Sequence, residues 1–421
     1  MNDIDLLVCG ASQVLTMDPA RFDGPDGDPD ARAVGAIAGG AVAIRDGAIV
    51  AVGREAELCA AYRAADTLDA AGGVVAPGLV DPHTHTVFAG SRHVEFGMRL
   101  RGATYHEILA AGGGIHSTVA ATRAASLEEL VDLALPRLER ALRFGVTTME
   151  VKSGYGLDFE TEIKILEAVR VLGERQPIRL VPTFLGAHVV PREYAERRHD
   201  YVDLLVSRLV PEVARRGLAV ACDVFLDRGA FEPDEARAIL GAARSHGLRA
   251  KIHAGQFTDR AGPELVAELD GLSADHLEVV SDAGVAAMAR AGVVAVLLPG
   301  AAFSLRDEFP SGRRFADAGV RVALATDNNP GTSRTENLPL MASMGAARMG
   351  LTAAEAICGV TSHAAAALGL SGEIGGLAPG KRADLAILRI PDFRSLIYHF
   401  GVNHTAAVVI GGSVAAQGMT S

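Results

Sequence analysis

The central part of the chain alternates short apolar runs with amphipathic stretches, and this alternation restricts the possible folds more than any other feature. Strand-like runs occur at residues 79–85, 146–152, 179–188, 219–226, 248–253, 271–276, 293–299 and 321–327. Helical patterns lie between most of them, such as the capping-box pair Ser126 and Glu129 ahead of an apolar stripe. Eight strand–helix units over roughly 290 residues predict an α/β fold with a closed, TIM-like (β/α)8 barrel. An open doubly wound sheet is the alternative.

The two ends of the chain have a different pattern from the middle. Short strand-like runs flank Asp46–Gly47 near the N-terminus and Gly411–Gly412 near the C-terminus, and both pairs are typical of tight hairpin turns. The polar residues 20–34 are expected to form a loop. We therefore predict one small composite β-sandwich domain built from residues 1–78 and 371–421, with residues 79–370 forming the barrel.

Polar side chains that can bind metal follow several of the strand-like runs. His83 and His85 are two residues apart at the end of the first run, so they point to the same side of a strand. His253 and Asp327 end two later runs, and the carboxyl ends of barrel strands are where catalytic residues gather. Three imidazoles and one carboxylate suit a zinc-like ion with room for water. His276 ends a further run and is a candidate to hold a proton or to orient the attacked oxygen.

Composition argues against several classes of partner. The chain has 40 Lys and Arg against 51 Asp and Glu, a net charge of −11, and no basic run, which disfavours nucleic acid or an anionic membrane as a partner. No apolar run reaches about 18 residues and the first residues lack a signal-peptide pattern, so we expect a cytoplasmic protein. Its four cysteines form no C-x-x-C pair, so neither a zinc knuckle nor a disulfide framework is expected.

Several motifs give the chain a resemblance to a known family. It resembles the metal-dependent amidohydrolases, and among them the imidazolonepropionases, over nearly its whole length. The His-x-His motif and the late Asp are common to the whole superfamily, whereas the Gly-Ser-Arg and Ser-Gly-Tyr-Gly segments narrow the resemblance. The most specific segments are HTHTVFAGSR (83–92), GGGI (112–115), VKSGYG (151–156), FLGAH (184–188), SADH (273–276) and ATDNNPG (325–331).

The resemblance implies a ring-opening hydrolysis of 4-imidazolone-5-propanoate to N-formimidoyl-L-glutamate in histidine degradation. It implies one metal ion per chain, zinc or iron, and a homodimer. A guanidinium such as Arg92 can bind the propanoate group of the substrate in a bidentate, charge-assisted way. The implied metal ligands are His83, His85, His253 and Asp327. The implied substrate contacts are Arg92, Tyr155, His188, Asn329, Gly331 and Thr332.

Two departures from related sequences affect the expected chemistry. Many members of the family have a glutamate where this chain has Gln256, and an amide cannot accept a proton as a carboxylate does. Our hypothesis is that Asp327 deprotonates the nucleophile, His276 stabilises the oxyanion, and Gln256 hydrogen-bonds the substrate ring. The fourth strand-like run lacks the lysine that bridges two metals in dinuclear amidohydrolases, which favours a single ion. Lys152 is expected to be a salt-bridging or substrate-side cation.

Two alternatives stay open at the level of sequence. A related aminohydrolase (deaminase) acting on another nitrogen heterocycle would use the same metal ligands and release ammonia. A non-catalytic barrel that serves as a binding module would be expected to lack a metal ligand, and none of the four is missing here. Tyr105, which is close in sequence to Arg92, is a further candidate for the pocket wall.

Overall fold

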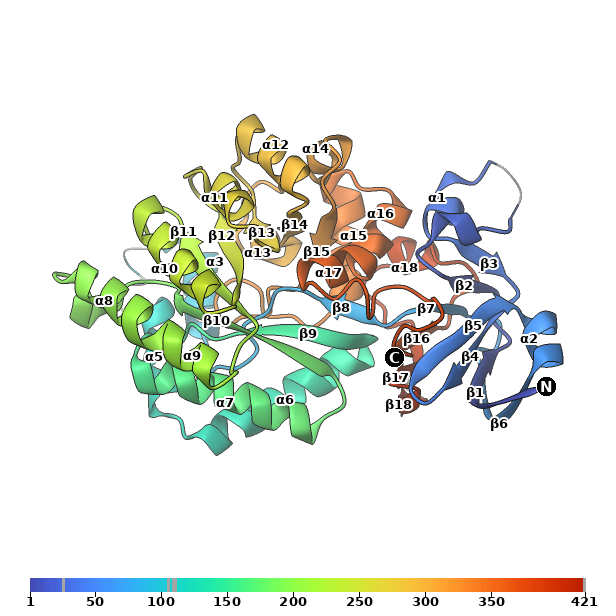
Figure 1. Ribbon diagram of the computed structural model, residues 1–421. Coiled ribbons are helices and arrows are strands. Elements are labelled where there is room, and N and C mark those ends of the chain that lie inside the picture. The colour runs from blue at the N-terminus through green and yellow to red at the C-terminus, as the bar shows by residue number, and fades with distance from the viewer. Residues whose placement is uncertain (25–26, 104–106, 108–111, 419–421) are drawn as a thin grey trace.

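The computed structural model describes residues 1–24, 27–103, 107 and 112–418. A helix-covered barrel forms the larger part, and a smaller β-rich part holds both ends of the chain (Figure 1). The N-terminal strands, in blue, lie beside the C-terminal strands, in red, in the smaller part.

The barrel is an eight-stranded parallel sheet in which the strands follow one another in chain order. Its first and last strands meet beyond their regular ends, where Thr84 and Asn328 form a parallel bridge. The peptide N–H of Asp327 donates to the His83 carbonyl and that of His85 donates to the Asn328 carbonyl, both at 3.0 Å. The predicted closed barrel is therefore confirmed, and the open sheet is not observed. The strands are β8 (Leu79–Asp81), β9 (Val146–Lys152), β10 (Arg179–Ala187), β11 (Ala221–Leu226), β12 (Arg249–Ala254), β13 (Ser273–His276), β14 (Val294–Leu297) and β15 (Val322–Leu324).

Helices cover the outside of this barrel (Figure 1). Ser126 and Glu129 form the predicted capping box at the start of α6, and the side chain of Asp158 caps α7. The described helices that follow β8 are α3 (His93–Leu100), α5 (Ile115–Ala124), α6 (Leu127–Arg143), α7 (Phe159–Arg175), η2 (Arg192–Tyr194), α8 (Arg198–Leu204), η3 (Leu205–Leu209), α9 (Val210–Arg215), α10 (Pro233–Ser245), α11 (Gly262–Glu268), α12 (Asp282–Ala291), α13 (Pro299–Leu305), α14 (Gly312–Asp317), α15 (Leu338–Met349), α16 (Ala353–Gly359) and α17 (Ser362–Ala367).

The main apolar core lies between the strands and these helices. Leu130, Leu138, Leu166 and Leu172 of α6 and α7 are buried in one cluster with Met149 and Val151 of β9. On β9 the residues that alternate with these two apolar ones, Glu150 and Lys152, are charged and equally buried. Because successive side chains alternate faces of a strand, the charged residues point to the barrel interior. The barrel therefore has an apolar outer layer and, at β9, a charged interior.

The smaller part is a composite of both ends of the chain, as predicted. One sheet has four strands, in the order β5 (Ala48–Arg54), β4 (Gly40–Arg45), β1 (Asn2–Cys9) and β6 (Tyr62–Asp69). The other has six, in the order β18 (Ser413–Gln417), β17 (Thr405–Ile410), β16 (Leu385–Leu388), β7 (Val74–Pro77), β2 (Gln13–Leu15) and β3 (Ala36–Ala38). Both predicted hairpins are present, as β4–β5 and β17–β18. Apolar side chains of the two sheets, such as Val8, Ile44, Ile387 and Val409, share one cluster.

Residues 20–34 differ from the expected loop. The structure places η1 (Pro19–Arg21) and α1 (Pro29–Ala33) there, each with an Asp as N-cap and a Pro in its first position, while residues 25–26 lie outside the described part. Two other short helices, α2 (Glu55–Ala61) and α18 (Ser395–Tyr398), complete the described helices. The domain limits at residues 78/79 and 370/371 stay a prediction.

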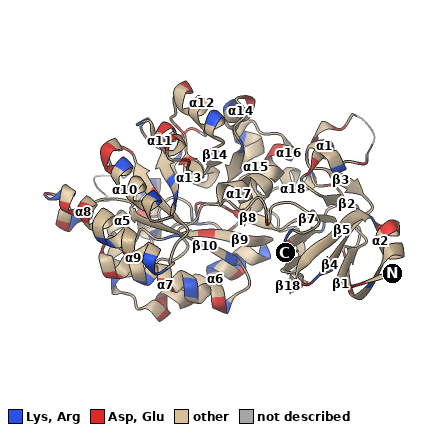
Figure 2. Ribbon diagram, in the orientation of Figure 1, with Lys and Arg blue, Asp and Glu red and all other residues tan. Residues whose placement is uncertain are grey.

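Charged residues are interspersed over the outer helices, with Lys and Arg beside Asp and Glu (Figure 2). Among the described residues, no helix has both the length and the apolar character needed to cross a membrane.

Candidate metal centre and active site

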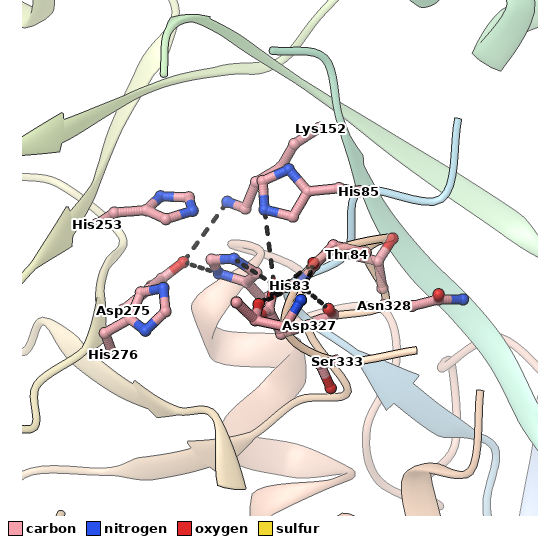
Figure 3. Close-up of polar contacts among 12 residues, drawn as sticks. His83, Thr84, His85, Lys152, His253, Asp275, His276, Asp327, Asn328 and Ser333 are labelled. Carbon is pink, nitrogen blue, oxygen red and sulfur yellow. Dashed lines mark hydrogen bonds and ion pairs between the residues drawn. The ribbon is translucent and has the colours of Figure 1, made fainter. Parts of the chain in front are cut away.

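The four predicted metal ligands converge at the carboxyl ends of the barrel strands (Figure 3). Ligand atoms of His83, His85 and His253 all lie within 4.8 Å of one another. Oδ1 of Asp327 is 3.7 Å from Nε2 of His83 and 3.7 Å from Nε2 of His85. His83 and His85 follow β8, His253 lies on β12, and Asp327 follows β15. Segments more than 240 residues apart in sequence therefore meet at one point because the barrel closes.

The backbone at this edge has an unusual conformation at two residues of the site. Asp327 has a φ of 49° and His276 has a φ of 82°, both in the region that residues with a Cβ rarely adopt. Such conformations persist where the surrounding structure fixes them, and they concentrate at functional sites. Here the peptide N–H of Asp327 is fixed by the His83 carbonyl.

The donor set fits a metal ion. All four side chains are buried, and Nε2 of both His83 and His253 has no hydrogen-bond partner among the described residues. Burial lowers the pKa of His83 and of His85 well below the usual value, so both imidazoles are neutral, which is the form that binds metal. Burial also raises the pKa of Asp327 to about 7, although His276 opposes this shift.

Two further carboxylates hold the histidines in place. Nδ1 of His83 lies 2.6 Å from Oδ2 of Asp275, and Nδ1 of His253 lies 2.9 Å from Oδ2 of Asp223. A carboxylate at Nδ1 selects the tautomer in which Nε2 carries the lone pair. The hydrogen bond of His83 leaves its Nε2 free to bind an ion, and the Asp223 contact of His253 is at an ion-pair distance.

These carboxylates belong to a buried ionic network in the barrel interior. Nζ of Lys152 lies 2.7 Å from Asp223, 2.8 Å from Glu150 and 3.5 Å from Asp275. Nζ of Lys251 lies 2.8 Å from Glu150. Burial disfavours the charged form of Lys152, but Asp223, Glu150 and Asp275 outweigh it and raise its pKa. Of the two roles expected for Lys152, the structure places it in a salt-bridge network.

The charges of this network favour a cation at the histidine cluster. Two lysines face three carboxylates, Glu150, Asp223 and Asp275, so the network carries one negative charge. An ionised Asp327 adds a second. A divalent ion among the neutral imidazoles would balance both charges in a region from which water is excluded.

A cavity of about 210 Å³ opens beside the histidine cluster. Its wall contains all of the predicted substrate contacts except Gly331, which instead packs against Arg92 so closely that a Cβ there would lie 2.2 Å from Nη1. The cavity is lined by His85, Arg92, Ile115, Tyr155, His188, Val189, Phe225, His253, Gln256, Phe257, His276, Asp327, Asn329 and Thr332.

Aromatic and polar side chains shape this cavity. The His188 ring stacks on His85 at 5.2 Å between centroids, and its Nδ1 lies 3.0 Å from the Gly154 carbonyl. Tyr155 lies 5.5 Å from His188, ring centre to ring centre. On the opposite segment, Oδ1 of Asn329 accepts hydrogen bonds from the peptide N–H groups of Gly331 and Thr332. Each side chain is thus fixed by a neighbour before any ligand enters.

His276 stands at the edge of the cluster. Its ring centre is 5.4 Å from that of His253 and 5.9 Å from that of His83. Burial disfavours its charged form, but Glu278, with Oε1 at 3.7 Å from Nδ1, and then Asp327 reverse the effect and raise its pKa. His276 is therefore the imidazole of the site whose surroundings favour a bound proton.

The segment that carries Tyr155 is held by a residue that sequence reasoning missed. The buried carboxylate of Glu162 accepts hydrogen bonds from the peptide N–H groups of Gly154 at 3.0 Å, Gly156 at 2.8 Å and Leu157 at 2.9 Å. On its other side, Arg123 donates to the carbonyls of Gly156 and Leu157. The signal available in the sequence was a carboxylate in the first turn of α7, directly after the Gly-Tyr-Gly segment.

Asp223 and Lys251 were not predicted as part of this network, although a signal existed for them. Glu150, Asp223 and Lys251 are charged residues inside otherwise apolar strand runs, which indicates an inward face that is not apolar. Tyr105, the further candidate for the pocket wall, lies outside the described residues.

Two family models match the chain. The model described as "Amidohydrolase family" matches residues 98–396, and the one described as "Imidazolonepropionase-like composite domain, bacteria" matches residues 40–65. The chain is 51% identical to the imidazolonepropionase of Geobacillus thermodenitrificans over 382 residues, 90% of each chain. It is 50% identical to that of Myxococcus xanthus over 423 residues, which cover 99% of this chain and 98% of the relative.

Solved structures with the same fold are more distant in sequence. An adenosine deaminase from Xanthomonas campestris with bound zinc has a TM-score of 0.73 at 19% identity, covering 98% of this chain and 93% of its own. A 5-methylcytosine deaminase from Klebsiella pneumoniae has a TM-score of 0.74 at 15% identity, covering 99% and 98%. These two establish the fold alone, whereas the family model over residues 98–396 and relatives that are about half identical establish the family. The chain belongs to the imidazolonepropionase family of the amidohydrolases.

Proposed function

We propose that this protein hydrolyses the imidazolone ring of 4-imidazolone-5-propanoate to N-formimidoyl-L-glutamate in the degradation of histidine. One observation carries the proposal: a single cavity joins the Arg92 guanidinium to a cluster of three imidazoles and one carboxylate. The substrate has the matching parts, a carboxylate at one end and a cyclic amide at the other. Relatives at 50–51% identity over most of the chain are imidazolonepropionases.

The reaction adds one water and breaks one ring bond. The water oxygen adds to the ring carbonyl carbon, and the bond from that carbon to the ring nitrogen breaks. The nitrogen takes up a proton and becomes part of the formimidoyl group, while the carbonyl carbon becomes a carboxylate. The site must therefore accept a proton from water, stabilise an oxyanion and return a proton to nitrogen.

His83, His85, His253 and Asp327 are the residues that would hold the metal ion. Zinc or iron bound there supplies Lewis-acid chemistry. Asp327 is assigned as the base, because its buried carboxylate lines the cavity beside the histidine cluster. His276, with a raised pKa, donates to the developing oxyanion.

The remaining lining residues bind the substrate. Arg92 forms the bidentate ion pair with the propanoate group. Tyr155 and His188 lie against one face of the ring, and Gln256 hydrogen-bonds its polar edge, since an amide can both donate and accept. Asn329, Gly331 and Thr332 form the turn that faces them.

Three finer features are part of the same proposal. One metal ion binds per chain, because the fourth strand, β11, offers Asp223 and no lysine bridge. Zinc is supported by the zinc bound in the adenosine deaminase of the same fold. The protein is proposed to act as a cytoplasmic homodimer on this small-molecule substrate, with no nucleic-acid or membrane partner.

The decisive experiment is turnover of freshly generated imidazolone propanoate by the purified protein, followed as loss of its ultraviolet absorbance. Turnover with no ammonia released supports the proposal. Ammonia released from a purine or pyrimidine, with no imidazolone consumed, would support the aminohydrolase alternative, which the relatives do not favour. Metal analysis that finds about one ion per chain supports the enzyme assignments, whereas no bound ion would support the binding-module alternative.

A further inference from the structure

A second and larger cavity, of about 510 Å³, adjoins the active-site cavity and shares Arg92 and Thr332 with it. We call it the arginine cavity, because Arg92, Arg99, Arg137 and Arg334 all line it. None of its described lining residues is an aspartate or a glutamate. Its size is that of a site for a small molecule.

Two of the four guanidiniums are neutralised by neighbours and two are not. Arg92 pairs with Glu95 at 2.8 Å, and Arg334 pairs with Glu336 at 2.6 Å. Among the described residues, neither Arg99 nor Arg137 has a carboxylate within ion-pair distance. Arg99 donates to the Gly331 carbonyl instead. The cavity therefore has an excess of positive charge.

Arg137 is the unusual member of this group. Its side chain is only 6% exposed, and Nη1 donates to the carbonyls of Thr86 and Phe88 while Nε has no hydrogen-bond partner. Its guanidinium carbon lies 3.6 Å from the centre of the Phe88 ring. Burial and then Arg334 lower its pKa. A guanidinium keeps its charge even so, and a buried charge without a counter-ion is costly.

Apolar side chains form one part of the remaining wall, and Ser, Thr and His side chains form the rest. Phe96 and Phe303 are 44% and 65% exposed, and Leu340, Met341 and Met344 of α15 lie with them along the same cavity. A ligand that fits must therefore offer an anionic group to the guanidiniums and an apolar body to these side chains. A planar carboxylate matches the fork of arginine donors.

We propose that the arginine cavity binds a small carboxylate with an apolar body, whose carboxylate pairs with Arg137. This binding site is separate from the metal centre, and ligand binding there does not require the proposed hydrolase activity. The ligand supplies the counter-ion that the described chain does not provide for Arg137.

A fluorescent carboxylate tests the proposal directly. The metal-loaded full-length protein is titrated with 1-pyrenebutanoate, and the neutral 1-pyrenebutanol is the matched control ligand. The acid is expected to bind once per chain in this cavity and about ten-fold more tightly than the alcohol, as a charge-assisted hydrogen bond predicts. Arg137→Met should weaken binding of the acid about ten-fold. Arg170→Met, an exposed arginine on α7, should leave it unchanged.

A second variant keeps the test decisive if Arg137→Met fails to fold, since Arg137 also bonds to two carbonyls. Met344 lines the arginine cavity and not the active-site cavity, so Met344→Trp should fill it and abolish binding of the acid. Equal binding of acid and alcohol, or undiminished binding by Met344→Trp, would overturn the proposal. The proposal would also be overturned if the acid does not bind because a second copy of the chain covers the cavity. Sedimentation velocity detects such a dimer.

Discussion

Nδ1 of His83 lies 2.6 Å from Oδ2 of Asp275, a residue 192 positions later in the chain, and both side chains are buried. The same carboxylate lies 3.5 Å from Nζ of Lys152. Asp275 thus connects the His83 imidazole, a proposed metal ligand, to the ionic network (Figure 3). Its negative charge makes the imidazole a better electron donor and fixes the direction of Nε2.

Asp275→Asn is expected to weaken metal binding by about 10- to 100-fold, because the charge at Nδ1 of His83 is lost while the shape of the side chain is kept. Competition between the purified protein and a chromogenic zinc chelator measures this affinity. Asp132→Asn, on the exposed face of α6, is the matched control and should bind zinc like the parent. Equal zinc affinity for both variants would show that Asp275 does not tune the ligand.

Much of the fold could be predicted from the sequence. The spacing of apolar residues and the residue types at turns are both local signals. The apolar run before His83 and the pair Asp46–Gly47 each specify their own conformation. The short helices η1 and α1 also had such a signal, an Asp cap followed by Pro, which the polar composition of residues 20–34 obscured.

The pairing of charges inside the barrel could not be predicted in the same way. Lys152 contacts Asp223, 71 residues away, and which lysine meets which carboxylate depends on the stagger of neighbouring strands. The sequence placed His83, His253 and Asp327 at strand ends, and barrel closure determines that they meet. Glu162 likewise supports the Tyr155 segment through a contact across a turn, and the spacing of apolar residues along the sequence does not predict such a contact.

Asp327→Asn tests which residue accepts the proton. The amide can still offer an oxygen to a metal, but it cannot accept a proton, so turnover should fall about 10²- to 10⁴-fold. Metal content is measured on the same sample, because loss of metal alone would also abolish activity. If the variant keeps its metal and turns over at a near-normal rate, Asp327 is not the base, and His276 becomes the residue to test.

Arg92→Met tests recognition of the propanoate group. Loss of the guanidinium should raise KM by about ten-fold or more, because a charge-assisted pair contributes roughly 1.5–3 kcal/mol. The effect on kcat should be smaller, since the group that Arg92 binds does not react. Arg92 also contacts Glu95 and lines the arginine cavity, so Glu95→Gln is measured beside it to separate loss of the ion pair from loss of substrate binding. A KM equal to that of the parent would contradict the assignment.

Glu162→Gln tests whether the hydrogen bonds from the Glu162 carboxylate hold the Tyr155 segment in position. Oε1 of Glu162 accepts from Gly156 and Leu157, and Oε2 accepts from Gly154. In the Glu162→Gln variant, an NH2 group replaces one of these two oxygens. At least one of the three peptide N–H groups then faces a hydrogen-bond donor and loses its acceptor. Gly154 has a φ of 106°, and its carbonyl meets Nδ1 of His188, so a shift there moves two sides of the cavity.

For Glu162→Gln we therefore expect KM to rise about ten-fold, the cost of one unsatisfied buried donor, while metal content stays that of the parent. Glu160→Gln is the matched control: Glu160 lies in the same first turn of α7 but is exposed, and its substitution should change neither KM nor thermal stability. A purely structural role predicts a lower melting temperature with KM unchanged. A rise in KM measured well below the melting temperature separates positioning of Tyr155 from loss of fold stability, because Glu162 itself does not line the cavity.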